Sequence, residues 1–216
     1  METDNVLKRI LEIEHGFVHI LDAAKEILSS SSEERSFAKE QCFEFALELL
    51  KHEAYQARML ATAILGHLAG TNSEALLFLK DRVSLDMNWR VQEMLAKAFD
   101  TFCKEQGYEE SLPVIREWLD SDNANVVRAV TEGLRIWTSR PFFKENPCLA
   151  IEWLSRHRGH ESEYVRKSVG NALKDISKKH KESVAEELKK WDLSDPLVLF
   201  TYKHASKHPN KDIKKQ

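Results

Sequence analysis

The chain has 216 residues, of which 42% are hydrophobic and 31% are charged, and its formal net charge is −3. Such a composition belongs to a folded soluble protein that is long enough to bury a core, which excludes disordered and fibrous chains. No apolar run approaches the roughly 20 residues that cross a bilayer, and the N-terminus is acidic rather than basic then apolar, so we expect a cytoplasmic protein with no membrane segment. With only 7 Gly and 5 Pro and no clusters of β-branched residues, the sequence favours helices.

Charge is distributed unevenly along the chain. Residues 1–50 carry 5 basic and 11 acidic side chains, whereas residues 201–216 carry 5 basic and 1 acidic. Proteins that coat nucleic acid indiscriminately draw their affinity from phosphate neutralisation, so the slightly acidic total argues against that class. The basic C-terminal tail, 203–216, is either a local basic surface or a solvated chain end.

Two helices are expected first, near residues 5–15 and 17–29, where they would cap one end of the fold, and residues 29–34 follow as a loop. Four later segments resemble one another, and when they are aligned on Ala57, Val91, Val127 and Val165 they repeat at 34, 36 and 38 residues. Apolar residues recur in them at three- and four-residue intervals, which is typical of amphipathic helices. These repeated helices are predicted at 55–65, 89–100, 126–137 and 164–175.

Partner helices are predicted between the repeated ones, and capping or turn-forming residues stand at the joints. Their expected ranges are 37–51, 73–83, 108–119, 147–157 and 182–191. Periods of 34 to 38 residues are those of two-helix solenoid repeats, and no Gly- or Pro-rich linker divides the chain. We therefore predict one all-α domain over residues 1–216, a single α-solenoid superhelix.

Cysteines and histidines give no sign of a metal or cofactor. Cys42, Cys103 and Cys148 are odd in number and have no CxxC spacing, so we expect reduced core residues. Two histidine pairs have the i,i+4 spacing that can hold a metal, namely His15 with His19 and His204 with His208. Neither pair has an evident third ligand, so we predict no metal site, and no cofactor motif is present.

Three strings identify a known family by resemblance: NWRVQEMLAKAFD, AVTEGLRIWTSRPFF and SEYVRKSVGNALKDISKKH, in this order. They resemble the HEAT-like repeat DNA alkylation repair family, which includes the AlkD- and AlkC-type alkylpurine DNA glycosylases and their uncharacterised relatives. The resemblance covers roughly residues 40–192. It implies a monomeric HEAT-like solenoid that holds alkylated double-stranded DNA on its concave face and hydrolyses the N-glycosidic bond of N3- or N7-alkylpurines.

The resemblance also implies roles for individual residues. Trp89 matches the tryptophan that opens the catalytic helix of the family, and Glu93 stands where the family keeps its catalytic carboxylate, usually Asp in the AlkD branch. Arg128 matches an arginine of the next repeated helix. Asn171 stands where the AlkD branch carries a second tryptophan, so one aromatic contact to the deoxyribose is replaced.

These residue types suit the chemistry. Alkylation at N3 or N7 makes the purine a cationic leaving group, so bond cleavage needs no acid, and one anion near the sugar stabilises its oxocarbenium character. Glu93 would supply that anion, and Trp89 shares its helix face four residues earlier. Phosphate contacts and a further lesion contact complete the predicted site: Arg128, Arg135, Arg166 and Trp137.

Structural alternatives stand beside these assignments. Glu93 and Lys97 have the spacing of a surface ion pair, the arginines that follow a valine in such helices often join a polar ladder between repeats, and Trp137 can be a core residue. The alternative function is a catalytically inactive relative that binds another protein on the same solenoid. The acidic first 50 residues and Asn171 favour it.

Overall fold

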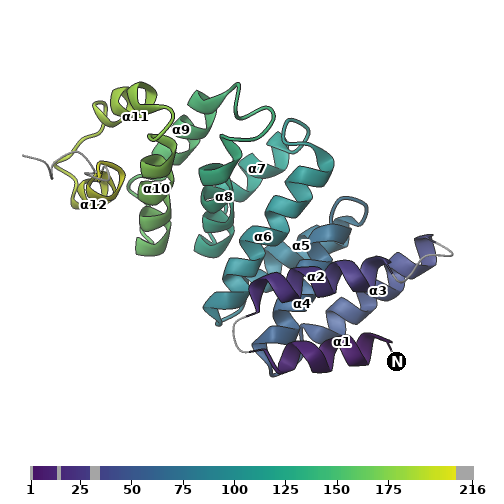
Figure 1. Ribbon diagram of the computed structural model, residues 1–216. Coiled ribbons are helices and arrows are strands. Elements are labelled where there is room, and N and C mark those ends of the chain that lie inside the picture. The colour runs from purple at the N-terminus through teal and green to yellow at the C-terminus, as the bar shows by residue number, and fades with distance from the viewer. Residues whose placement is uncertain (1, 14–15, 30–34, 208–216) are drawn as a thin grey trace, which may run out of the picture. The chain divides into compact units, whose positions relative to one another are not determined.

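Every regular element of the described residues is a helix (Figure 1). The computed structural model describes residues 2–13, 16–29 and 35–207, and the predicted all-α class is confirmed within these ranges. No helix among them is long and apolar enough to span a membrane. The chain divides into two compact units, Met1–Pro113 (unit 1) and Val114–Gln216 (unit 2), and each is described by itself. A single domain over 1–216 stays a prediction.

Unit 1 is built around helix α4, which contacts α1, α2, α3, α5 and α6. Almost the whole circumference of α4 is buried because small residues alternate with Leu, Ile and Met along it. Gly66 lets α6 approach closely, since a Cβ at this position would lie 2.6 Å from the Cα atom of Ala98. The helices of this unit are α1 (Glu2–Leu11), α2 (Phe17–Ser29), α3 (Arg35–Leu49), α4 (Tyr55–Leu68), α5 (Ser73–Asp81), the short η1 (Val83–Leu85) and α6 (Trp89–Gln106).

Unit 2 has an aromatic core. Trp137 stacks on Phe143 with ring centroids 5.6 Å apart, and Trp153 meets the same Phe143 edge-on at 6.1 Å. Helix α10 contacts both α8 and α12. The helices are α7 (Leu112–Leu119), which begins two residues before this unit, α8 (Ala124–Trp137), α9 (Pro147–Arg156), α10 (Glu163–Ile176), α11 (Lys181–Leu188) and α12 (Pro196–Ala205).

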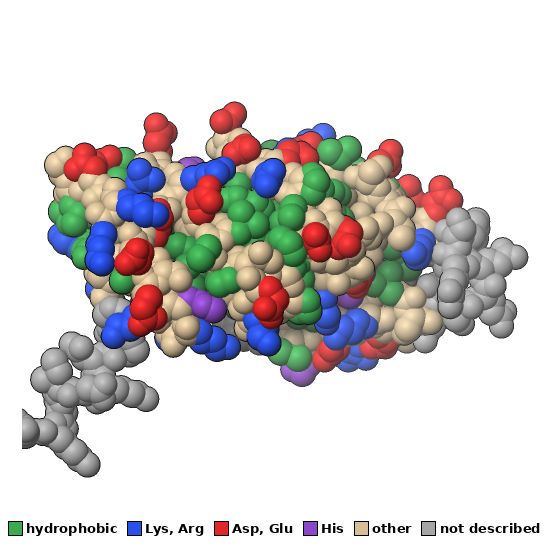
Figure 2. Space-filling model, turned by 90° about the horizontal axis from the view of Figure 1, so that it is seen from above, with side chains coloured by type: hydrophobic (Ala, Val, Ile, Leu, Met, Phe, Trp, Pro, Cys, Tyr) green, Lys and Arg blue, Asp and Glu red, His purple; other side chains and the backbone are tan. Residues whose placement is uncertain are grey.

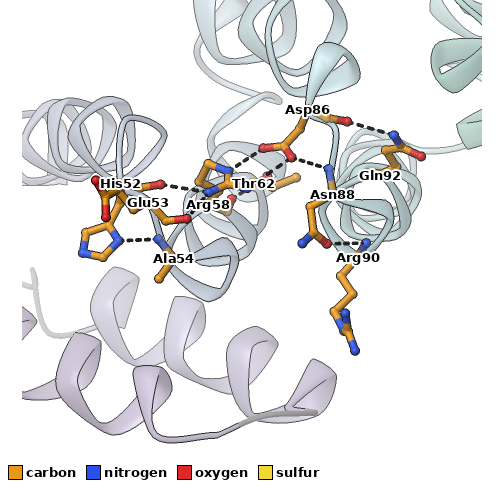
Figure 3. Close-up of polar contacts among 9 residues, drawn as sticks. All are labelled: His52, Glu53, Ala54, Arg58, Thr62, Asp86, Asn88, Arg90 and Gln92. Atoms are coloured by element: carbon orange, nitrogen blue, oxygen red, sulfur yellow. Dashed lines mark hydrogen bonds and ion pairs between the residues drawn. The ribbon is translucent and has the colours of Figure 1, made fainter.

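The start of α4 is fixed by one arginine side chain, shown in Figure 3. Arg58 Nη1 donates to the carbonyl oxygens of His52, at 2.9 Å, and Glu53, at 2.7 Å. The Nε and Nη2 atoms of the same side chain donate to the Asp86 carboxylate, at 2.6 and 3.3 Å. Arg58 therefore joins the loop before its own helix to the loop before α6.

The same bond recurs at the start of two other repeated helices. Arg166 Nη1 donates to the carbonyl oxygens of His160, at 2.6 Å, and Glu161, at 2.7 Å. Gln92 Nε2 donates to the carbonyl oxygen of Asp86 at 2.8 Å. In each case the acceptor includes the residue six positions earlier, and the donors hold equivalent places in the predicted repeat. We call this bond the helix-start lock of Arg58, Gln92 and Arg166.

Several expectations about single elements are corrected. The first helix runs from Glu2 to Leu11 rather than over 5–15, and the helix expected at 108–119 begins only at Leu112. The later start has two causes. Gly107 has a φ of 97°, which ends the preceding helix, and the residues after it form a turn in which the Ser111 hydroxyl donates to the Gly107 carbonyl oxygen. Helix α12 is not among the expected elements.

The remaining corrections concern cysteines and the tail. Cys42 and Cys103 are buried as expected, but Cys148 is exposed because it lies in the first turn of α9. Burial raises the pKa of the Cys103 thiol above its ordinary range. The expected basic tail begins inside α12, and its residues 208–216 lie outside the described part, as does His15.

Candidate functional site

A pocket of about 230 Å³ opens among α2, α4 and α6 of unit 1. Two of the sequence-predicted residues, Trp89 and Glu93, line it together. The other lining residues are Gly16, Phe17, Ile20, Tyr55, Gln56, Met59 and Arg90. Its walls are therefore largely apolar and aromatic, and Glu93 is the carboxylate among the lining residues. We call this cavity the Trp89 pocket.

Trp89 and Glu93 lie one helical turn apart on the same face of α6. Trp89 is 54% exposed, an unusual state for a tryptophan that packing alone would bury. Glu93 is exposed and has no hydrogen-bond or ion-pair partner among the described residues, so the surface pair with Lys97 that the spacing allows is not formed. The structure thus brings together the two residues that the family resemblance places at the centre of the chemistry.

The position of α6 is fixed by the polar contacts in Figure 3. The backbone N–H of Asn88 donates to Asp86 Oδ1 at 2.8 Å, and the Asn88 side chain caps the helix by accepting from the backbone N–H of Arg90 at 3.0 Å. Asp86 is held in turn by Arg58 and Gln92. Because the loop before α6 is tied on both sides, the first turn of the helix presents its side chains from a rigid base.

The sequence predicted only Trp89 and Glu93 among the lining residues, and Tyr55 and Arg90 are among those that it missed. The Arg90 guanidinium lies over the Trp89 ring at 4.5 Å and over the Tyr55 ring at 5.0 Å. A signal for Tyr55 was present, because it stands two residues before Ala57 as Trp89 stands two residues before Val91. Both repeats therefore place an aromatic residue at the first position of the helix.

The remaining predicted site residues belong to unit 2. Arg128 on α8 is half-buried, and its side chain has no partner among the described residues. Asn171 on α10 is also half-buried, and its side-chain oxygen accepts from Lys174 Nζ at 3.5 Å. These two side chains are the least engaged of the predicted group in this unit.

Arg135 is already engaged in ion pairs. Its guanidinium donates to Asp175 of α10 and lies 3.5 Å from Glu132 of its own helix. Burial opposes the charged form of Asp175, but hydrogen bonds from Lys178 and Arg135 outweigh it and hold the pKa of this carboxyl below its ordinary value. The arrangement matches a polar ladder between neighbouring helices, which favours the structural interpretation of Arg135.

The side chains of Arg166 and Trp137 are buried in unit 2. Arg166 is 7% exposed, and its Nη1 atom forms the helix-start lock. Trp137 is 0% exposed and belongs to the aromatic core. Burial favours the structural alternative for both, and their predicted contacts with DNA stay untested predictions.

No group of three or more His, Cys, Asp or Glu side chains within 2–13, 16–29 and 35–207 is placed to hold a metal ion. The Trp89 pocket is lined by aromatic rings, by the Arg90 guanidinium and by the Glu93 carboxylate. The rings and the carboxylate attract positive charge, whereas the guanidinium repels it.

Known structures match this chain over nearly its full length. A crystal structure of AlkD2 from Streptococcus mutans is 47% identical, covers 95% of this chain and 96% of that one, and has a TM-score of 0.87. The structure of smu.31 from Streptococcus mutans UA159 is 44% identical, covers 96% of this chain and 98% of that one, and has a TM-score of 0.84. A predicted DNA alkylation repair enzyme from Enterococcus faecalis, 18% identical with a TM-score of 0.66 over 90% of this chain and 86% of that one, shares the fold.

Sequence relatives agree. The uncharacterized protein YhaZ of Bacillus subtilis (strain 168) is 34% identical over 101 residues, which are 45% of this chain but only 28% of that longer protein. The model of the family described as DNA alkylation repair enzyme matches residues 19–210. The structural neighbours bear out the HEAT-like fold expected from the repeats. With a match over most of its length, the chain belongs to the DNA alkylation repair enzyme family.

Proposed function

We propose that the protein binds DNA that carries cationic N3- or N7-alkylpurines, takes up the damaged nucleotide at the Trp89 pocket and hydrolyses its N-glycosidic bond. Glu93 is the catalytic carboxylate of this proposal. One observation carries it: Trp89 and Glu93 line the same pocket, and Glu93 has no partner among the described residues. A carboxylate without a partner is available to a developing positive charge.

The reaction needs little from the protein. A purine alkylated at N3 or N7 leaves as a neutral base, and the sugar it leaves becomes an oxocarbenium ion. Glu93 stabilises that cation and accepts a proton from the attacking water, while Trp89 packs beside the deoxyribose. Water attacks the anomeric carbon, the glycosidic electrons go to the base, and the products are free base and an abasic sugar.

Phosphate contacts are assigned to unit 2. This unit carries 20 basic and 15 acidic residues, a net charge of +5, whereas unit 1 carries 12 basic and 20 acidic residues, a net charge of −8. On the face shown in Figure 2 the two signs are interspersed, so the contrast is one of totals. Arg128, whose side chain has no described partner, is the foremost candidate for a phosphate contact.

The test is base release from N-methylated duplex DNA at low salt under single-turnover conditions, with 3-methyladenine and 7-methylguanine as the products measured. We expect Glu93→Gln to lower the rate by about 10²- to 10³-fold, as loss of one electrostatic stabiliser does. Glu48→Gln is the matched control, because Glu48 is an exposed glutamate of unit 1 that does not line the pocket. Equal rates for wild type and Glu93→Gln would refute the catalytic role.

A second candidate is a non-catalytic family member whose solenoid binds another protein. The observation in its favour is that Arg135, Arg166 and Trp137, three of the side chains assigned to DNA, are engaged within unit 2. The net charge of −8 on unit 1 also repels phosphates. Under this function the same assay gives no base release, and the protein does not retain methylated duplex DNA even at low salt.

A further inference from the structure

Another pocket, of about 330 Å³, lies within unit 2 among the end of α10, helix α11 and the end of α12 (Figure 1). Its volume falls in the range of roughly 300 to 1,000 Å³ that is typical of small-molecule sites. Seven of its lining residues are apolar or aromatic, two are serines and two are lysines, and none of these described residues is acidic. We call this cavity the Lys181 pocket.

One face of α11 forms a wall of this pocket. Lys181, Val184, Ala185 and Leu188 follow one another at intervals of one to three positions that span two helical turns, so their side chains share that face. Helix α11 packs against α9 and α10, and α12 packs against α10. The pocket therefore lies between two helices that rest on a common support.

The rest of the wall combines a fixed ring with accessible groups. Trp191 is buried, and its ring N–H donates to Ser155 Oγ at 2.8 Å, which holds the ring in place. Leu193 is 38% exposed, so water still reaches apolar surface here. The hydroxyl of Tyr202 has no hydrogen-bond partner among the described residues and is available to a ligand.

The two lysines of the pocket differ in how they are engaged. Lys189 Nζ lies 3.8 Å from Glu186 Oε1, and both side chains are about three-quarters exposed. Lys181 has no ion-pair partner within the described part of the chain. Unit 2 as a whole carries a net charge of +5. An apolar cavity with lysines at its wall, in a positively charged unit, favours a ligand with an apolar body and a negative charge.

We infer that the Lys181 pocket binds an aliphatic carboxylate, with the carboxylate at Lys181 and the alkyl chain along Val184 and Leu188. Lys181 and Lys189 stand eight positions apart, which is about 12 Å along the helix axis. An extended chain advances about 1.2 Å per bond, so about ten carbons cover this distance. The Tyr202 hydroxyl is a second donor for the carboxylate. The pocket shares no residue with the Trp89 pocket, and its ligand does not depend on the proposed hydrolysis.

Isothermal titration calorimetry of the full chain with decanoate, kept below its micellar concentration, tests the inference. Decyltrimethylammonium, which has a chain of the same length and the opposite charge, is the comparison ligand. We expect saturable binding of one decanoate per chain, at least about fivefold tighter than binding of the cation. Lys181→Met should weaken decanoate binding by about twofold to fivefold, because one partly exposed charge pair is lost.

The matched control is Lys203→Met, which removes the same charge from an exposed lysine of α12 that does not line the pocket. Its affinity for decanoate should equal that of the wild type. Ala185→Phe places a ring in the cavity from an exposed position and should weaken binding by more than about tenfold.

Absence of saturable decanoate binding would overturn the inference, as would equal affinity for the cation. Equal affinities of Lys181→Met and Lys203→Met would remove the carboxylate from Lys181. Unchanged binding by Ala185→Phe, with a wild-type circular dichroism spectrum, would place the ligand elsewhere on the protein and overturn the assignment of the pocket.

Discussion

Arginine side chains in this protein form ion pairs of equal length but different burial, and burial determines how much each pair contributes to stability. The Arg58–Asp86 pair is 2.6 Å long, and its side chains are 19% and 12% exposed. The Arg156–Glu152 pair has the same length, but its side chains are 62% and 56% exposed. Water screens the second pair and not the first, so equal geometry predicts unequal stabilisation.

We therefore expect Arg58→Met to lower the free energy of unfolding by about 2 to 4 kcal/mol, since it leaves Asp86 and two backbone carbonyls without their donor. Arg156→Met should lower it by less than about 0.5 kcal/mol. Urea unfolding followed by circular dichroism measures both. Similar losses in the two variants would show that the helix-start lock adds nothing beyond a surface ion pair.

Sequence reasoning at the level of single residues was sound where position alone decides the environment. Trp89 and Glu93 open a helix and share a face, so their common pocket was predictable. The same valine–arginine pair, however, contains the half-buried Arg128 in one helix and the buried Arg166 in another. The difference arises from neighbouring elements, such as Phe200 of α12, whose ring lies 5.1 Å from the Arg166 guanidinium.

Packing between helices α4 and α6 depends on one missing side chain. A Cβ at Gly66 would lie 2.6 Å from the Ala98 Cα atom and 2.9 Å from its carbonyl oxygen, and backbone atoms in a helix cannot move aside. We expect Gly66→Ala to lower the free energy of unfolding by about 1 to 3 kcal/mol from overpacking, although Ala favours the helix.

Gly70→Ala is the control for this change. The nearest atom to its new Cβ is Nε2 of Gln106, the far end of a flexible side chain that can turn away at the cost of its exposed hydrogen bond to the Gly70 carbonyl oxygen. Its effect should stay within about 1 kcal/mol. Thermal unfolding of the two variants measures the contrast, and a Gly66→Ala variant as stable as wild type would show that α4 and α6 can separate freely.

Two histidines in the turn between α9 and α10 are expected to make unit 2 sensitive to acid. Burial and then the neighbouring His160 lower the pKa of His157, against the attraction of Asp120. Burial also lowers the pKa of His160, with Glu161 opposing and Arg166 assisting. Both imidazoles are therefore held neutral in the folded state below the ordinary pKa of 6.5.

Since the unfolded chain then binds more protons than the folded one, the free energy of unfolding should fall as pH drops from about 7.5 to about 5.5. His157→Gln should make this decline shallower. Asp175 and Glu187, whose pKa values are lowered, lose their contributions only at more acidic pH. Urea unfolding at several pH values tests this, and an unchanged slope in His157→Gln would contradict it.

Most elements were predictable because their ends carry chemical signals. Asn72 and Asn123 each accept a backbone N–H at a helix start where the sequence placed a joint, and Asn88 does the same before α6. Helix α12 carries the same kind of signal, since the Asp195 side chain accepts from the backbone N–H of Leu197, but its apolar residues form no clear stripe and the helix was therefore not predicted. Helix α12 packs against α10, and no pattern in the local sequence predicts this tertiary contact.

At the scale of the whole molecule, the two units differ in charge by 13 elementary charges, from −8 to +5. If unit 2 binds DNA, its affinity for DNA must fall as the salt concentration rises, because binding releases counterions from the phosphates. In a plot of log affinity against log salt concentration, each phosphate contact contributes about one unit of slope. Arg128→Ala should reduce that slope by about 1. Arg156→Ala, which removes an arginine already paired with Glu152, should leave it unchanged.

Fluorescence anisotropy with a labelled duplex over a series of salt concentrations measures these slopes. Identical slopes for wild type and Arg128→Ala would remove Arg128 from the DNA contacts. A wild-type affinity that does not depend on salt would remove phosphate binding from the proposed function altogether.

The helix-start lock has a consequence for how such a chain can lengthen. Donor and acceptor lie within seven consecutive residues, and the two arginine copies, from His52 to Arg58 and from His160 to Arg166, stand 108 residues apart. A segment that carries its own start signal keeps it wherever it is copied, because no partner from another repeat is needed. Duplication of such a segment would add a helix with a defined beginning, provided that the copy keeps the donor side chain and the loop six residues before it.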